Sequence, residues 1–406
     1  MTLCQVNGLL AHTHLRPLPT QWIALSPILF NTLKIEAPSF SNALPTLSQR
    51  DEIYVNIPFE NLSHISHFVH RKFKRCGGFR ILSQAPEIKP NNELFKRFPD
   101  VEFGEFWPNE LDKLITLDYT LTRSQEVYEW FESTSETYRN SVIHQLTSYK
   151  TRYYKSPEGI AALEWIGKEW ERLTSNRNDV LVTYFKHQNF EQPSIILRIQ
   201  GSDEIKKNKI IILGGHGDSI NSDDPEKGLR SPGADDNAAG IALLSDLIKL
   251  IVEKNYRPKH TIEFIAYAAE EVGLQGSNEL AELYHKSGKQ VIGVLQFDGV
   301  NFSGKTFDMA LIADGTNKEQ TLFVASIIDE YLKTNWTWEK CGYACSDHYS
   351  WHIQGYRTSF PVESISSEQN PYIHTAEDTF EKSLFSSKKA DLFEKLGIAY
   401  LLELDK

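Results

Sequence analysis

Hydrophobic and polar positions in the second half of the chain alternate between short apolar runs and stretches with helical spacing. Short apolar runs bounded by turn residues predict buried strands. Helical spacing predicts helices at about 124–173 and at 241–252. This alternation favours an α/β fold, in which an open, mixed, mostly parallel sheet carries helices on both faces. The apolar runs lie at residues 180–185, 195–199, 210–213, 262–267, 291–297 and 359–362.

The first half of the chain has a different pattern, which predicts a small α+β unit. Residues 22–25 and 53–57 are strand-like, and apolar residues recur at helical spacing between Leu62 and Phe73. From Pro86 to Pro108 the chain is rich in proline and charge and has no period, which is typical of a linker. We therefore expect two domains, an α+β domain with its linker at 1–106 and a larger domain at 107–406.

Composition and charge exclude several classes of protein. The chain has 406 residues, of which 40% are hydrophobic and 24% charged, a profile typical of a globular protein with a sizeable core. Its formal net charge is −11, which argues against nucleic acid or an anionic membrane as a partner. No apolar stretch approaches the roughly 18 residues that a membrane helix needs. The acidic excess lies in the second part of the chain, since residues 1–106 carry more basic than acidic side chains.

The N-terminal residues and the cysteines bear on cellular location. The first residues lack the basic start and continuous apolar segment of a secretory signal, so the protein is either cytosolic or secreted with its signal already removed. Cys341 and Cys345 are four positions apart, a spacing compatible with a short-loop disulfide or with two reduced thiols. A disulfide at this place would favour export.

Ionisable residues collect where the predicted strands end. Because the carboxyl ends of parallel strands meet at one edge of a sheet, we expect these side chains to lie together. So many carboxylates would repel one another unless a cation were bound among them. Imidazole and carboxylate ligands suit zinc, with manganese or cobalt as alternatives. The candidates are His216, Asp218, Asp235, Asp236, Glu270, Glu271, Asp298 and His374.

Taken singly, each candidate also has a simpler interpretation. An isolated aspartate at a strand end is more often a helix cap or a turn former, and Asp236 is a candidate for that role. An isolated Glu-Glu pair is usually solvated. The metal hypothesis depends on the occurrence of a potential ligand in each of four consecutive strand-end loops.

Six segments of the sequence, in order, resemble the secreted bacterial leucyl aminopeptidases, a family of exopeptidases with two catalytic zinc ions. The resemblance runs from about residue 120 to 402 and implies an aminopeptidase that acts on peptides with a free N-terminus. The segments are GGHGDS, SPGADDNAAG, AYAAEEVGLQGS, LQFDG, CGYACSDHYSWH and NPYIHTAEDT.

The resemblance implies a role for each metal ligand. Asp235 would be the carboxylate that bridges the two zinc ions. Glu271 and His374 would complete one zinc site, and His216 and Asp298 the other.

It also implies the catalytic residues and a disulfide. Glu270 would be the general base and not a ligand, and Asp218 would orient His216. A turn after Ala269 would be needed to direct Glu270 and its neighbour to one site, because adjacent residues of an extended strand point to opposite sides. Cys341 and Cys345 would form a disulfide beside the substrate pocket.

The side-chain pocket departs from the leucine-preferring members. Gly299 replaces a bulky apolar residue, and Ser366 and Gln369 replace aromatic ones, so we expect a wider, more polar pocket for bulky or cationic side chains. Glu368 lies close by in the sequence and is a candidate for attracting a cation, although a solvated carboxylate is the simpler interpretation. The expected pocket residues are Gly299, Ile312, Tyr343, Phe360, Val362, Ser366, Gln369 and Ile373.

The first half of the chain resembles the N-terminal propeptide of the same family, most clearly in LSHISHFVHRKFKRCGGF. The resemblance implies a secreted precursor, whose N-terminal part assists folding and masks the active site. Cys76 follows a basic helix, where nearby cations favour the thiolate. It would pair with Cys4, pack against the adjacent glycines, or face the active-site metal.

Two other classes of function compete with the aminopeptidase. The first is a single-zinc glutaminyl cyclase or a carboxypeptidase on the same scaffold. The second is a binding domain without catalytic activity, against which the full set of candidate ligands argues. We further expect a monomer that binds neither nucleic acid nor membrane.

Overall fold

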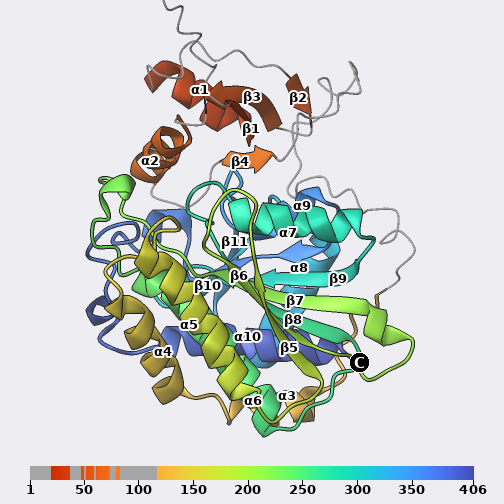
Figure 1. Cartoon of the computed structure of the whole chain (residues 1–406). Helices are drawn as coiled ribbons and strands as arrows, with labels where there is room; N and C mark the ends of the chain where they lie inside the picture. The colour runs from red at the N-terminus through yellow and green to blue at the C-terminus, as the bar shows by residue number, and fades with distance from the viewer. Residues whose placement is uncertain (1–19, 37–46, 50–51, 59–60, 74–78, 83–116) are drawn as a thin grey trace, which may run out of the picture.

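The computed structural model of the chain describes residues 20–36, 47–49, 52–58, 61–73, 79–82 and 117–406 (Figure 1). Cys4, Cys76 and the predicted linker at 86–108 lie outside these residues. Among the described helices, none combines the length and the apolar character needed to span a lipid bilayer.

A six-stranded sheet forms the centre of the larger part of the molecule, with the strand order β12-β9-β7-β8-β6-β5. β12, β9, β7 and β8 run parallel, whereas β6 and β5 are antiparallel to their neighbours. The predicted mixed, mostly parallel sheet is confirmed. Its strands are β5 (Val180–Phe185), β6 (Ser194–Ile199), β7 (Lys209–His216), β8 (Thr261–Tyr267), β9 (Gln290–Gln296) and β12 (Thr358–Ser359).

Helices cover both faces of this sheet. Successive residues of a strand point to opposite faces, so alternate residues of one strand pack against different helices. Ile211 and Leu213 of β7 pack in the large core with residues of α6 and α10, whereas Ile210 and Ile212 pack with residues of α7 and α9. Both sides of β7 are therefore apolar, which explains its continuous apolar run in the sequence. The helices are α3 (Ser124–Phe131), α4 (Glu136–Ser148), α5 (Pro157–Leu173), α6 (Ala239–Glu253), α7 (Gln275–Lys286), α8 (Lys318–Ile327), α9 (His348–Ile353) and α10 (Lys388–Leu404).

The strand predicted at residues 359–362 is wrong as a single strand, because the structure has two short strands there. The stretch 359–362 is divided between β12, in the large sheet, and β13 (Pro361–Val362), which pairs with β10 (Met309–Ile312). Phe360 lies at the change of sheet, where its carbonyl accepts a hydrogen bond from Ile312 N. β10 also pairs with β11 (Trp336–Glu339), so a second, three-stranded sheet lies beside the first.

The N-terminal unit, which we define as the elements between Thr20 and Leu82, has its own sheet and core. Its strands are ordered β2-β3-β1-β4 and all pair antiparallel. Ile23, Leu33 and Val69 are among the residues of a separate hydrophobic cluster. Figure 1 shows this unit against one side of the larger body, with α2 and β4 nearest to it. Its elements are β1 (Thr20–Leu25), α1 (Pro27–Glu36), β2 (Leu47–Gln49), β3 (Glu52–Pro58), α2 (Asn61–Phe73) and β4 (Phe79–Leu82).

Candidate active site

The candidate ligands lie at the carboxyl end of the three central parallel strands. His216 is the last residue of β7, Asp298 follows β9, and Glu271 follows β8. His374 lies in the loop beyond β13, where its carbonyl accepts a hydrogen bond from Ser222 N over 2.8 Å. The structure therefore brings together the strand-end residues that the sequence singled out.

Asp236, and not Asp235, lies between the two histidines. Its Oδ1 is 3.0 Å from His216 Nε2, and its Oδ2 is 2.8 Å from His374 Nε2. The carboxylate of Asp235 turns away and accepts hydrogen bonds from Asn301 N over 2.8 Å and from Asn370 Nδ2 over 2.9 Å. The assignment of the central carboxylate to Asp235 is corrected to Asp236, because the irregular turn at 234–238 directs these neighbouring side chains to different sides.

A further carboxylate lies beside each histidine. Asp298 Oδ1 is 3.3 Å from His216 Nε2, and Glu271 Oε2 is 3.3 Å from His374 Nε2. All five side chains are buried. In a tetrahedral zinc site with bonds of about 2.0–2.1 Å, ligand atoms are roughly 3.3 Å apart, so the spacing of these atoms fits a metal. The donor set also fits, since imidazole and carboxylate are the ligands that zinc takes in catalytic sites.

Residues behind the candidate ligands hold them in place. Asp218 Oδ1 lies 3.4 Å from His216 Nδ1 and accepts a hydrogen bond from Glu270 N over 3.0 Å. The other oxygen of Asp218 accepts from Glu271 N over 3.2 Å. Ser346 Oγ donates to Asp298 Oδ2 over 2.6 Å. Asp218 thus connects one histidine to the turn that carries both glutamates.

Asp378 is a supporting residue that the sequence analysis missed. Its two carboxylate oxygens accept hydrogen bonds from the backbone N–H groups of Asp235 and Asp236, over 3.2 and 3.1 Å. It lies four residues after His374 in the quoted NPYIHTAEDT segment, so the signal was present in the sequence. Its carboxylate fixes the turn that presents Asp236.

The turn after β8 gives two adjacent glutamates different surroundings. Ala269 has a φ of +53°, and this left-handed backbone conformation makes the expected turn. Glu270 is fully buried, and neither of its carboxylate oxygens has a hydrogen-bond partner among the residues that the structure describes. Burial raises the pKa of Glu270 well above its usual value, because the charged form is poorly solvated there. A carboxylate with a raised pKa next to a metal site suits general-base catalysis.

His70, from α2 of the N-terminal unit, reaches into the same site. Its Nε2 is 2.9 Å from Glu271 Oε2, and its ring meets the ring of His374 edge-on with 4.2 Å between centroids. The sequence analysis missed this residue. The signal that points to it is the recurrence of histidine every third residue at 64, 67 and 70, within the segment that resembles a propeptide.

A pocket opens beside the candidate ligands, and the structure places most of the expected residues around it. Gly299, Phe360, Val362, Gln369 and Ile373 line the pocket. Ile312 and Tyr343 pack behind it, in an apolar cluster with Cys345 and Phe360. The lining residues that the sequence analysis did not expect as pocket residues are Asp235, Asp236, Asp298, Cys341, Cys345, Glu363, Ser364 and Asn370.

Two polar residues near the pocket differ from expectation. Ser366 is exposed and does not line the pocket. Its backbone N–H donates a hydrogen bond to Glu339 Oε2 over 2.8 Å. Glu368 accepts hydrogen bonds from the backbone of Lys305 and Thr306 and lies away from the pocket. Glu363 does line the pocket, together with Asp235, Asp236 and Asp298, and its pKa is raised well above its usual value by burial and by the neighbouring Asp235.

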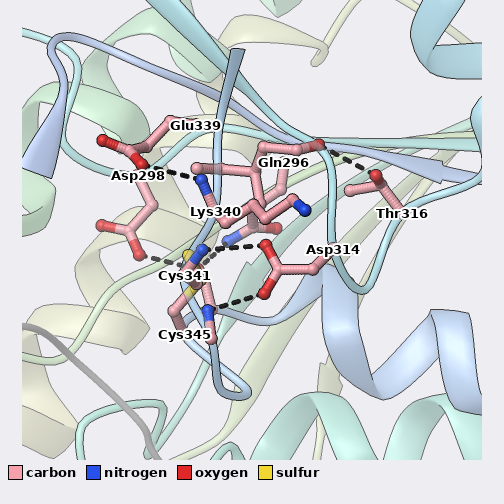
Figure 2. Close-up of a disulfide and its surroundings, with 11 residues drawn as sticks. Gln296, Asp298, Asp314, Thr316, Glu339, Lys340, Cys341 and Cys345 are labelled. Carbon is pink, nitrogen blue, oxygen red and sulfur yellow. Dashed lines mark hydrogen bonds between the residues drawn. A yellow bond between two sulfur atoms is a disulfide. The ribbon is translucent and has the colours of Figure 1, made fainter. Parts of the chain in front are cut away.

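Cys341 and Cys345 form the expected disulfide (Figure 2). Both residues line the pocket. Asp314 holds the loop between them, because its carboxylate accepts hydrogen bonds from Cys341 N over 2.8 Å and from Gly342 N over 2.6 Å. The disulfide therefore fixes one wall of the pocket.

Comparison with known proteins adds to this geometry. Residues 194–398 match peptidase family M28. A probable leucine aminopeptidase of Arthroderma benhamiae is 33% identical over 288 residues, which cover 70% of this chain and 77% of that protein. Leucine aminopeptidase 1 of Fusarium vanettenii is 30% identical over 333 residues, which cover 79% and 83%.

Solved structures show the same fold. LapB from Legionella pneumophila is 28% identical and superposes with a TM-score of 0.76, covering 95% of this chain and all of that one. The LapA aminopeptidase of the same organism is 23% identical, covers 95% and 98%, and has a TM-score of 0.77. The predicted resemblance is confirmed, and the chain belongs to peptidase family M28, among its aminopeptidases.

Proposed function

We propose that the enzyme is a zinc-dependent aminopeptidase that uses two zinc ions to release bulky or cationic residues from the N-terminus of peptides. The observation that carries the proposal is the carboxylate of Asp236, with one oxygen 3.0 Å from His216 and the other 2.8 Å from His374. A carboxylate placed between two imidazoles is the arrangement that a bridging ligand requires. Two ions held in this way form the symmetric clamp of two-metal hydrolases.

The proposed ligand set divides around Asp236. His216 and Asp298 would hold one ion, and Glu271 and His374 the other, with Asp236 shared. Bound zinc supplies the Lewis acidity that lowers the pKa of a water nucleophile and polarises the scissile carbonyl. His216 acts in its neutral form, and the nearby Asp218 orients its ring, as carboxylates do for metal-binding histidines.

Glu270 is the proposed general base. It would take a proton from the attacking water and pass it to the leaving amine. Its burial and raised pKa favour this role, because a carboxylate with a raised pKa is a stronger base. Glu271, one residue further along the turn, faces His374 and serves as a ligand.

The pocket supports the preference for bulky or cationic side chains. Gly299 lies on its wall, and a Cβ added there would meet no atom within 4 Å. Asp235 and Glu363 also line it. Burial raises the pKa of both carboxyls, and a cationic side chain in the pocket would favour their charged forms.

Filling the space at Gly299 tests the preference. Gly299→Met should shift the ranking of substrates toward leucine. Because Gly299 has a φ of +62°, any side chain there is strained, and Gly299→Ala is the control that shares the strain without filling the pocket. An identical ranking in the Met and Ala variants would contradict the pocket assignment.

The N-terminal unit is proposed to assist folding and to mask the active site. In this proposal residues 1–106 form the propeptide with its linker and residues 107–406 the catalytic domain of a secreted, monomeric enzyme. The contact of His70 with Glu271 supports the masking role, since it lies among the candidate ligands. Cys76, whose three possible roles lie outside the described residues, is not needed for it.

A panel of aminoacyl chromogenic substrates, assayed before and after limited proteolysis, tests the function. We expect activity that is abolished by a chelator, restored by zinc and increased by cleavage between the two domains. Metal content separates the alternatives, because two zinc ions per chain support the aminopeptidase and one ion supports a glutaminyl cyclase. No hydrolysis of any substrate by the cleaved, zinc-loaded chain would contradict the proposal.

A further inference from the structure

The contact between His70 and the active site has the hydrogen-bond pattern of a metal ligand. His70 Nδ1 is 2.6 Å from the carbonyl oxygen of Ser66. A carbonyl oxygen only accepts hydrogen bonds, so Nδ1 carries a proton and donates it. Histidines that bind metals almost always donate the second ring N–H to a carbonyl or carboxylate in this way.

The hydroxyl of Ser66 fits the same assignment. Ser66 Oγ donates to Glu271 O over 2.8 Å and therefore presents a lone pair to His70 Nδ1, 3.2 Å away. Both contacts require the proton on Nδ1. In the neutral ring, the lone pair of Nε2 then faces the carboxylate of Glu271 at 2.9 Å. Two acceptors at this distance repel each other unless a proton or a metal ion lies between them.

The positions of the surrounding atoms agree with a shared ion. Ligand atoms of His70, Glu271 and His374 all lie within 4.8 Å of one another, and all three residues are buried. Glu271 Oε2 is 2.9 Å from His70 Nε2 and 3.3 Å from His374 Nε2. These separations are close to the roughly 3.3 Å between ligands of a tetrahedral zinc ion.

Contacts made by α2 and by β4 hold the N-terminal unit, and with it His70, against the larger body. Ser66 reaches the backbone of Glu271, four residues before His70 on the same helix. On β4, Ile81 N donates to Gly273 O over 3.4 Å, and Ile81 O accepts from Asn278 Nδ2 over 2.6 Å. The N-terminal unit therefore contacts α7 and the turn of residues 270–273, and Glu271 belongs to this turn.

We propose that His70 is a metal ligand supplied by the N-terminal unit. It would complete the site of Glu271, His374 and the shared Asp236 with a fourth protein ligand. Catalytic zinc sites keep one position open, whereas sites with four protein ligands are closed. His70 would thus convert an open catalytic site into a closed one, and removal of the N-terminal unit would open it. The inference rests on the proposed two-metal function and names the group that masks it.

The test uses the 406-residue chain, uncleaved, with cobalt(II) or zinc as the probe. His70→Ala should weaken the binding of one of two metal equivalents by at least about tenfold, measured by competition with a chelator. The visible spectrum of the cobalt-loaded chain should change, because a ligand is lost. Hydrolysis of an aminoacyl substrate should rise without cleavage. His70→Gln, which keeps most of the side-chain volume, guards against failure of His70→Ala to fold.

His67→Ala is the matched control, since His67 lies on the same helix, is half-buried and belongs to no candidate metal group among the described residues. It should leave metal affinity and the cobalt spectrum unchanged. Higher activity in both His70 variants with unaltered affinity and spectrum would overturn the ligand assignment and leave His70 as a steric plug. A chain that binds no cobalt at all would instead overturn the two-metal function, and the inference with it.

Discussion

Two pairs of adjacent acidic residues lie in the candidate site, and the members of each pair differ in their surroundings. Asp235 faces Asn301 and Asn370, whereas Asp236 lies between two histidines. The sequence analysis placed this pair in the site but assigned the bridging role to Asp235, whereas the geometry favours Asp236. Neighbouring residues in an irregular turn share every property visible in a sequence, and only the backbone of residues 234–238 separates them.

Exchange of each aspartate for asparagine tests this assignment directly. Asp236→Asn should lose at least one metal equivalent, because an amide lacks the charge that binds two cations. Asp235→Asn should keep both, since an amide oxygen still accepts from Asn301 N. Metal content measured by atomic absorption after dialysis checks the pair. Loss of metal from Asp235→Asn alone would return the bridging role to that residue.

Glu270→Gln tests whether Glu270 is the general base or a metal ligand. The substitution should lower kcat by about 10²–10⁴-fold, because a proton acceptor is removed while the shape of the side chain is kept. Zinc content and thermal stability should stay at the wild-type values, since the carboxylate of Glu270 forms no hydrogen bond with His216 or His374 in the structure. Steady-state kinetics and metal analysis on one preparation check both points. A variant short of one zinc would show that Glu270 is a ligand.

At the scale of elements, the sequence predicted β6 to β9 of the large sheet because they are buried on both faces, whereas the edge strand β5 is partly exposed. β5 has the predicted bounds, and β7 is longer because it continues through Gly214 and Gly215 to His216. The division of 359–362 between two sheets could not be predicted, since it depends on the distant Ile312 that pairs at the break. β10 and β11 were missed for a similar reason, because each is short and gains its order from its neighbours.

Arg152 is an element-level support that no motif revealed. Its guanidinium is buried and donates to Gly217 O over 2.8 Å, to Gly233 O over 3.0 Å and to Pro232 O. It thus joins the end of β7 to the loop that leads into Asp236. Burial lowers the pKa of Arg152 to about 10, so the side chain stays charged at neutral pH.

Arg152→Met should therefore destabilise the fold and the metal site together. Leaving several buried carbonyls without donors should cost about 3 kcal/mol or more of the free energy of unfolding. Arg172→Met is the control, because Arg172 pairs with Glu169 on the surface and should contribute at most about 1 kcal/mol. Urea unfolding and zinc affinity measure the two effects. Equal stability of the two variants would exclude this role for Arg152.

At the scale of the whole molecule, the sequence indicated two units but not how they meet. Ser66 and Glu271, which contact each other, are 205 positions apart in the chain. β4 packs on the larger body, where a Cβ added to Gly273 would lie 2.7 Å from the ring of Phe79. A resemblance to a propeptide predicts masking in general terms. The identity of the proposed masking group depends on the register of α2 against the 270–273 turn, which no local pattern encodes.

Asn278→Ala should loosen this contact without touching the candidate ligands. Asn278 lies on α7 and donates to Ile81 O over 2.6 Å, so its loss removes one buried hydrogen bond between the units. Loss of about 1 kcal/mol of docking free energy corresponds to roughly a fivefold larger undocked population. Hydrogen exchange of the backbone amides of α2 should therefore accelerate about fivefold, and the activity of the uncleaved chain should rise in parallel.

Lys286→Ala provides the comparison on the same helix. Lys286 is exposed and pairs with Glu282 on the surface, so its removal should leave exchange in α2 unchanged. The two readouts report on different steps, because exchange follows undocking of α2 whereas activity also requires that the metal site open. Faster exchange with unchanged activity would mean that α2 moves while another group masks the site. Unchanged exchange in Asn278→Ala would show that the bond to Ile81 does not hold the two units together.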